Sequence, residues 1–103
     1  MHKIIIGLEV HVSLNTTTKL FCPCPLPKEG DEPNTKVCDT CAGLPGSKPL
    51  LNKKAVEYTL KLCLALHCKI AHELIFSRKI YYYPDLAKNY QITQYELPLG
   101  SNG

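Results

Sequence analysis

Four cysteines form the pattern with the clearest chemistry in this chain. Cys22 and Cys24 make a Cys-x-Cys pair, Cys38 and Cys41 make a Cys-x-x-Cys pair, and thirteen residues rich in Pro, Lys and acidic side chains lie between the pairs. A tetrahedral Zn²⁺ ion takes four thiolates at roughly 2.3 Å, and two short-spaced pairs in tight turns can supply them. Four free thiols, or two disulfides in a secreted protein, are the alternatives. The spacing and the turn residues favour a metal knuckle.

Two further cysteines, Cys63 and Cys68, carry a different interpretation. They are five residues apart in an apolar stretch with no turn residues between them. Free cysteine behaves as a small hydrophobic residue in protein cores. We therefore expect both side chains to be buried packing residues and not metal ligands.

A carboxylate and an imidazole alternate with apolar residues near the amino end. Residues 4–14 alternate with period two, which predicts a strand with one apolar face. Glu9 and His11 would project from the opposite face, roughly 6 to 7 Å apart along the strand. Such a pair could bind a divalent cation, and an imidazole suits Mn²⁺ or Zn²⁺ better than Mg²⁺. A solvent-facing pair at a sheet edge is the alternative.

Residues 77–94 combine cations, phenols and amides more densely than a core strand requires. Arg78, Lys79 and Lys88 could hold phosphates, and the tyrosines could stack on a base. The alternative is an ordinary solvated strand face. The sequence has no Gly-rich phosphate loop of the P-loop or Rossmann type. A nucleotide would therefore bind here through another architecture.

A small number of predicted elements position the candidate site residues. The cysteine loop and a Gly-Leu-Pro-Gly turn occupy residues 21–49 and show no periodicity. A helix is predicted from Asn52 as its N-cap, with Val56, Leu60, Cys63 and His67 along one stripe. This helix is expected to be structural.

Two strands are predicted after the helix, over residues 74–83 and 89–97, with Pro84-Asp85 between them. The predicted fold is α+β, with a mixed or antiparallel sheet, packed helices and a zinc-knuckle loop at 21–45. The chain ends on Ser-Asn-Gly directly after a strand. We therefore expect further elements of the same domain beyond residue 103.

Length and composition limit the possible functions. The chain has 103 residues, a net charge of +3, 45% hydrophobic residues, eight prolines and six glycines. This is enough for one small domain or a piece of a larger one, and the charge is too low to indicate nucleic-acid binding by itself. No apolar run reaches the length of a signal peptide or a membrane span. A reducing intracellular location is expected, which favours metal over disulfides.

Several short motifs, in order, closely resemble the amino-terminal part of the B-type subunit of the tRNA-dependent Asp/Glu amidotransferase, and the sister E-type family shares the same signature. The matching motifs are IGLEVHV at 6–12, FCPC at 21–24, PNT at 33–35, CDTC at 38–41, GLPG at 43–46, LNKKAVEY at 51–58, and the block from Arg78-Lys79 to Gln94. The resemblance covers nearly the whole chain. It implies that residues 1–103 are the amino-terminal fragment of a larger catalytic domain.

The resemblance also implies an activity and partners. Such an enzyme is a carbon–nitrogen ligase that uses glutamine as amido donor and acts on tRNA(Gln) charged with Glu or tRNA(Asn) charged with Asp. ATP phosphorylates the side-chain carboxylate, and ammonia from a separate amidase-type glutaminase subunit then displaces the phosphate. A small accessory subunit would complete a cytoplasmic heterotrimer, with no membrane partner. The isolated fragment is expected to be inactive.

Site residues follow from the same resemblance, motif by motif. Glu9 and His11 match a catalytic site that binds Mg²⁺ or Mn²⁺ next to the nucleotide. The four cysteines of the knuckle, Cys22, Cys24, Cys38 and Cys41, match a structural Zn²⁺ site. The wall of the pocket for ATP and the aminoacyl end is expected to include Lys79, Tyr82, Tyr83, Asp85, Lys88, Tyr90, Gln91, Thr93 and Gln94.

Two other interpretations of the residues remain open. One is a non-catalytic zinc-ribbon module that binds RNA or protein, in which Glu9 and His11 are surface residues. The other is a small disulfide-stabilised domain. A ribbon-type binder needs basic or aromatic residues opposite its knuckle and has no use for a carboxylate beside an imidazole, so residues 9 and 11 separate the first interpretation from an enzyme.

Overall fold

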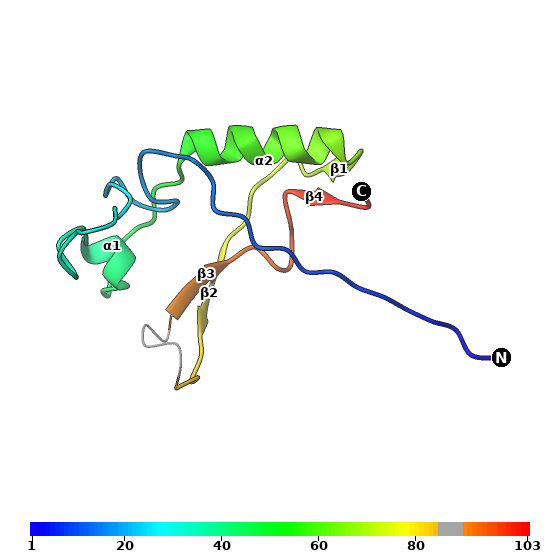
Figure 1. Ribbon diagram of the computed structural model, residues 1–103, viewed down its shortest axis with the longest axis horizontal. Helices are drawn as coiled ribbons and strands as arrows, with labels where there is room; N and C mark the ends of the chain where they lie inside the picture. Colours follow the sequence, from blue (N-terminus) through cyan, green and yellow to red (C-terminus); the bar gives the residue numbers. More distant parts are fainter. Residues whose placement is uncertain (85–89) are drawn as a thin grey trace.

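A computed structural model describes residues 1–84 and 90–103 (Figure 1). The described part is a small α+β structure with two helices and two separate sheets. Its elements, in chain order, are α1 (Asp39–Ala42), α2 (Lys53–Ala65), β1 (Lys69–Ile70), β2 (Ser77–Ile80), β3 (Tyr90–Thr93) and β4 (Gly100–Ser101). Neither helix is long and apolar enough to cross a membrane.

The long helix α2 begins at the predicted N-cap. The Asn52 side-chain oxygen accepts hydrogen bonds from the backbone N–H groups of Lys54 (2.9 Å) and Ala55 (3.2 Å), which satisfies two of the free donors at a helix start. The helix ends earlier than its apolar stripe suggested. His67 lies beyond it with φ 56°, and the Cys68 N–H donates to the Cys63 carbonyl at 2.8 Å. The placement of His67 on the helix stripe was therefore wrong.

Both sheets are two-stranded and antiparallel. In the first, β2 pairs with β3, with Ser77 opposite Thr93 and Ile80 opposite Tyr90. This pairing confirms the two strands expected after the helix, although both are shorter than predicted. In the second, β1 pairs with β4, so that Ile70 lies opposite Gly100. The α+β class, predicted with a mixed or antiparallel sheet, is confirmed in this coarse form, with both sheets antiparallel.

The second sheet packs against the end of α2 through a close contact. A Cβ atom added at Gly100 would lie 2.5 Å from the Cys63 sulfur and 3.2 Å from Cys68 Cβ. Only glycine therefore allows β4 to approach the helix this closely. Cys63 is buried, as predicted, and Cys68 is half-buried. Burial, followed by the neighbouring Cys68 thiol, raises the pKa of Cys63.

The predicted strand over residues 4–14 does not form among the described residues. This segment runs away from the body of the molecule as a long unpaired stretch (Figure 1). Its apolar side chains from Ile4 to Val12 are exposed, from 66% at Val12 to 92% at Leu8, whereas Leu14 is half-buried. Alternation predicts which side chains share a face, but a strand also needs a neighbouring backbone for its hydrogen bonds. No described segment supplies that neighbour.

The core is small and joins the cysteine loop to the helix. Its buried apolar residues are Cys22, Ala55, Cys63 and Leu99. The backbone between the loop and α2 is tied twice, because Leu50 N–H donates to the Phe21 carbonyl (2.9 Å) and Asn52 N–H donates to the Leu20 carbonyl (2.8 Å). The start of α2 is thus held directly against the first cysteine pair.

Candidate metal centre and neighbouring site residues

The four cysteines of the two short pairs converge in space. The sulfur atoms of Cys22, Cys24, Cys38 and Cys41 all lie within 4.8 Å of one another. Cys22 is only 4% exposed, and the other three side chains are half-buried. In a tetrahedron with metal–sulfur bonds of about 2.3 Å, neighbouring sulfurs are roughly 3.8 Å apart. The cluster therefore fits a four-thiolate metal ion.

The first pair sits in a tight turn closed by backbone hydrogen bonds. The Lys19 N–H donates to the Cys24 carbonyl at 2.9 Å, and Thr18 and Pro25 form an antiparallel bridge. The Cys24 backbone also hydrogen-bonds the Cys22 thiol, and this contact favours the thiolate. The turn thus brings both thiols to the same cluster.

The second pair uses the short helix α1. The Cys38 N–H donates to the Cys41 sulfur at 3.1 Å, and the Cys41 backbone donates back to the Cys38 thiol, so that the two thiols form a reciprocal capping arrangement. Gly43 ends α1 in the left-handed region at φ 72°, and the Leu44 N–H reaches the Asp39 carbonyl at 3.0 Å. The Gly-Leu-Pro-Gly turn therefore terminates this half of the cluster.

The thiols divide into two with raised and two with lowered pKa values. Backbone donation from Cys41 lowers the pKa of Cys38 to about 6. Burial raises the pKa of the Cys41 thiol, but hydrogen bonds that include those from Cys38 N–H and Lys19 lower it overall. Desolvation, followed by the neighbouring thiols, raises the pKa of Cys24 to about 12, and burial raises that of Cys22. The cluster holds negative charge mainly on its second pair.

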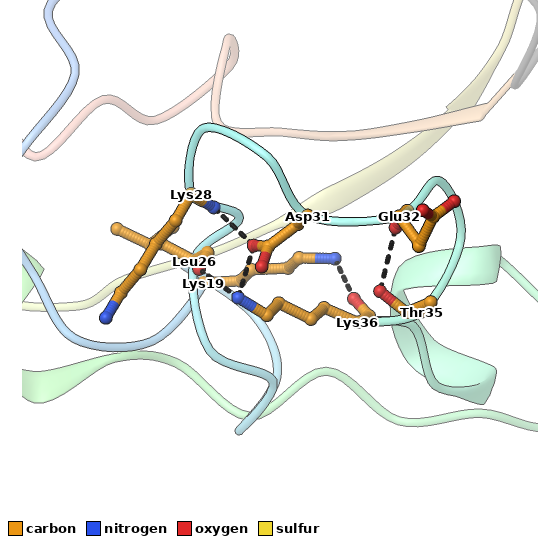
Figure 2. Close-up of polar contacts among 7 residues, drawn as sticks. All are labelled: Lys19, Leu26, Lys28, Asp31, Glu32, Thr35 and Lys36. Carbon is orange, nitrogen blue, oxygen red and sulfur yellow. Dashed lines mark hydrogen bonds and ion pairs between the residues drawn. The ribbon is translucent and has the colours of Figure 1, made fainter.

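Charged side chains organise the loop between the pairs (Figure 2). Lys36 forms an ion pair with Asp31, and this contact lowers the pKa of the Asp31 carboxyl. The Lys19 ammonium donates to the Lys36 carbonyl at 2.6 Å and to the Cys41 sulfur at 3.5 Å. Lys28 points its side chain away from this network (Figure 2). Sequence spacing did not single out Lys19 from Lys28 and Lys36. Its two contact partners, Lys36 and Cys41, lie 17 and 22 residues away along the chain.

All six cysteines are free thiols. The two-disulfide alternative is therefore wrong for this structure. A closed set of four sulfur ligands leaves no open position for a substrate, so an ion held there would be structural and not catalytic.

Glu9 and His11 lie next to each other on the unpaired amino-terminal segment. The His11 Nε2 atom is 3.0 Å from a Glu9 carboxylate oxygen, and the two side chains are 88% and 84% exposed. The expectation that they project from the same side agrees with this contact. The strand that was expected to carry them is absent from the described structure, so nothing there fixes their direction.

The strands β2 and β3 carry the next group of predicted pocket residues. Lys79 and Gln91 lie opposite each other in the register, and both are exposed. Tyr82 and Tyr83 follow β2 with 87% and 61% exposure. Asp85 and Lys88 lie outside the described residues.

The remaining predicted pocket residues, Tyr90, Thr93 and Gln94, are half-buried. The Tyr90 ring packs on Gly43, where an added Cβ would lie 3.0 Å from it. The Thr93 hydroxyl accepts a hydrogen bond from the Tyr95 N–H at 3.2 Å. Gln94 lines an apolar groove with Leu14, Phe76 and other residues, and its buried side-chain nitrogen has no hydrogen-bond partner among residues 1–84 and 90–103. Tyr90 therefore links β3 to the metal loop, whereas Lys79 and Gln91 face outward.

Comparison with known proteins agrees with the motif resemblance. The family described as the GatB/GatE catalytic domain matches residues 4–103. Proteins named as the B subunit of aspartyl/glutamyl-tRNA(Asn/Gln) amidotransferase are similar over almost the entire chain. The one from Carboxydothermus hydrogenoformans is 58% identical over 102 residues, which is 99% of this chain and 21% of the relative. The one from Thermus thermophilus is 54% identical over 103 residues, which is 100% of this chain and 22% of the relative.

The likeness extends to a third relative of the same name. The Methanoregula boonei protein is 56% identical over 100 residues, or 97% of this chain and 21% of the relative. The chain thus spans about a fifth of the length of the curated relatives it matches. Because the family match covers nearly every residue, the resemblance to the B-type subunit is confirmed, and the chain belongs to the GatB/GatE catalytic domain family.

Proposed function

We propose that this chain is the amino-terminal part of the catalytic domain of a B-type amidotransferase subunit, with residues 1–103 in that domain and the zinc knuckle at 21–45. The observation that carries the proposal is the family match over residues 4–103. Relatives that are 54–59% identical over the chain carry the name of this subunit.

In the assembled enzyme the proposed reaction converts a carboxylate into an amide on tRNA. A side-chain carboxylate oxygen attacks the γ-phosphorus of ATP, which releases ADP and leaves an acyl phosphate. Ammonia then attacks the acyl carbon, phosphate leaves with the electron pair of the broken bond, and the nitrogen loses a proton. Activation is necessary because a free carboxylate has no good leaving group. The substrates are Glu on tRNA(Gln) or Asp on tRNA(Asn).

A structural Zn²⁺ ion fits the four-cysteine cluster best. The four sulfurs are close enough for tetrahedral binding, and backbone N–H groups already point at Cys22, Cys38 and Cys41. When bound, the ion would fix the cysteine loop against the start of α2. Elemental analysis should find about one zinc per chain. Loss of both zinc and folding in Cys38→Ser would support a structural role, and stoichiometric absence of metal from protein purified without chelators would contradict it.

Glu9 and His11 are proposed as ligands of Mg²⁺ or Mn²⁺ at the nucleotide. Their side chains are in contact, open to solvent, and offer one oxygen and one nitrogen donor. A divalent ion at this place would neutralise phosphate charge as the anionic carboxylate approaches ATP. The exposed Lys79, Tyr82, Tyr83 and Gln91 are proposed for the nucleotide and aminoacyl pocket, together with Asp85, Lys88, Tyr90, Thr93 and Gln94.

The partners and location follow from the same assignment. Ammonia would come from an amidase-type glutaminase subunit, and a small accessory subunit would complete a heterotrimer. The proposed setting is the cytoplasm, where mischarged tRNA is made.

The catalytic assignment is tested by Glu9→Ala in the full-length complex. We expect loss of ATP-dependent amidation with tRNA binding nearly intact, because the substitution removes an exposed carboxylate and no core contact. Glu29→Ala is the matched control, since it removes another exposed carboxylate, in the cysteine loop. Amidation by Glu9→Ala at the rate of the Glu29→Ala control would remove Glu9 from the mechanism.

A further inference from the structure

A lysine lies in direct contact with a sulfur of the cysteine cluster. The Lys19 ammonium is 3.5 Å from the Cys41 Sγ atom and is anchored by a 2.6 Å hydrogen bond to the Lys36 carbonyl. Both contacts are partly buried. These two hydrogen bonds, one to a backbone oxygen and one to a sulfur, hold the Lys19 ammonium in one position.

A four-thiolate metal site carries negative charge that a nearby cation such as the Lys19 ammonium would stabilise. Four thiolates around one divalent ion leave a net double negative charge, which is costly to hold where the sulfurs are half-buried. Backbone N–H groups reach Cys22, Cys38 and Cys41 but bring no net charge. Lys36, a partly buried lysine of the cysteine loop, is already paired with Asp31. Lys19 is therefore well positioned to offset the charge of the site.

We propose that Lys19 is a positioning and charge-balancing residue of the metal centre, which donates a hydrogen bond to the Cys41 thiolate and thereby raises the affinity for zinc. The inference depends on the proposed zinc site and extends it to a residue outside the four ligands. It also gives the anchor on the Lys36 carbonyl a role, because that bond sets the reach of the ammonium toward the sulfur.

The test compares zinc affinity among lysine variants of this chain by competition with a chromogenic chelator. Lys19→Met keeps much of the apolar stem and removes the charge and the donor, and we expect it to weaken zinc binding about tenfold, as for other groups that support metal ligands. Lys19→Arg restores a cation with several donors and should bind within about threefold of the parent chain. Lys28→Met removes an equal charge from the cysteine loop without touching a sulfur, and should leave zinc affinity unchanged.

A spectroscopic measurement separates this role from a general effect on folding. With Co²⁺ in the site, removing a hydrogen bond from a thiolate raises the energy of the sulfur electrons and shifts the sulfur-to-cobalt charge-transfer band to lower energy. We expect that shift in Lys19→Met and not in Lys28→Met, with the helix signal in circular dichroism equal in both. If Lys19→Met fails to fold, the Co²⁺ band of Lys19→Leu, which also lacks a donor and a charge, is compared instead.

Three results would overturn the inference. They are an unshifted cobalt band in the Lys19 variant, parental zinc affinity in Lys19→Met, and equal weakening by Lys19→Met and Lys28→Met. If the parent chain takes up no zinc, both the proposed zinc site and the proposed role of Lys19 are wrong. If the parent binds zinc and Lys19→Met matches it, only the role of Lys19 fails.

Discussion

The rings of Phe21 and Phe76 meet edge to face, with centroids 5.2 Å apart and an interplanar angle of 84°. Phe21 directly precedes the first cysteine of the metal loop, and Phe76 directly precedes β2. Edge-to-face packing is a favoured aromatic geometry. This contact therefore joins the metal loop to the β2–β3 sheet, which carries Lys79, Tyr90, Gln91 and Thr93 of the proposed pocket residues.

The aromatic contact should be measurable as a coupling energy. In a double-mutant cycle of Phe21→Leu and Phe76→Leu, we expect a coupling of about 0.5–1.5 kcal/mol in the free energy of unfolding, as is typical of aromatic pairs. Urea unfolding of the zinc-loaded chain supplies the four values. Strict additivity of the two substitutions would mean that the rings do not support each other.

Asn52 should contribute more to the free energy of unfolding than an ordinary helix N-cap does. Its oxygen caps α2, and its side-chain nitrogen donates to the Thr18 hydroxyl at 2.8 Å and the Thr18 carbonyl at 3.2 Å. Asn52→Ala loses both sets of bonds, and we expect it to lower the free energy of unfolding by about 2–3 kcal/mol. Asn52→Asp keeps the cap and loses the donor, so its loss should be smaller. Equal losses in urea unfolding would show that the cap contributes nothing.

The metal-free chain should react first at Cys38. Backbone donation from Cys41 lowers the pKa of this thiol to about 6, so it is mainly thiolate at pH 7, whereas desolvation raises the pKa of Cys24 to about 12. With substoichiometric iodoacetamide we expect labelling at Cys38 ahead of Cys24, with the Cys38 rate rising through about pH 6. Peptide mass spectrometry identifies the site. Preference for Cys24, or no protection when zinc is added, would contradict the prediction.

Zinc binding should release protons. Below their raised pKa values the thiols of Cys22 and Cys24 carry protons that a metal must displace, whereas Cys38 has already lost its proton at pH 7. We expect release of about two to three protons between about pH 7 and 8, so that zinc affinity rises with pH and falls as the solution is acidified. Calorimetry in buffers of different ionisation enthalpy counts these protons. Release of one proton from every thiol would mean that the Cys38 pKa is not lowered.

Local patterns predicted the local parts of the structure. The cap at Asn52, the convergence of the four cysteines and the pairing of β2 with β3 depend on residues close in sequence or on ligand spacing, and each is present. The stripe through His67 was wrong because α2 ends at Ala65 and the His67 backbone lies in the left-handed region at φ 56°, although no glycine marks that turn.

Contacts between distant segments were beyond the reach of sequence patterns. The alternation over residues 4–14 predicted a strand, but the described structure holds no partner for it. The approach of Lys19 to Cys41 spans 22 residues, and that of Phe21 to Phe76 spans more of the chain. Such contacts arise from how the loop folds back on α2, which composition and periodicity do not encode.

The exposed amino-terminal stretch should limit the solubility of this chain when it is studied by itself. Ile4, Leu8 and Val12 are at least 66% exposed beside peptide groups that no neighbouring strand covers in the described part of the chain. Such a ribbon is a template to which another extended chain adds edge to edge, so self-association should set the concentration at which solutions of this chain turn cloudy. A lysine in place of Ile6 would raise that concentration while leaving the thiol cluster untouched.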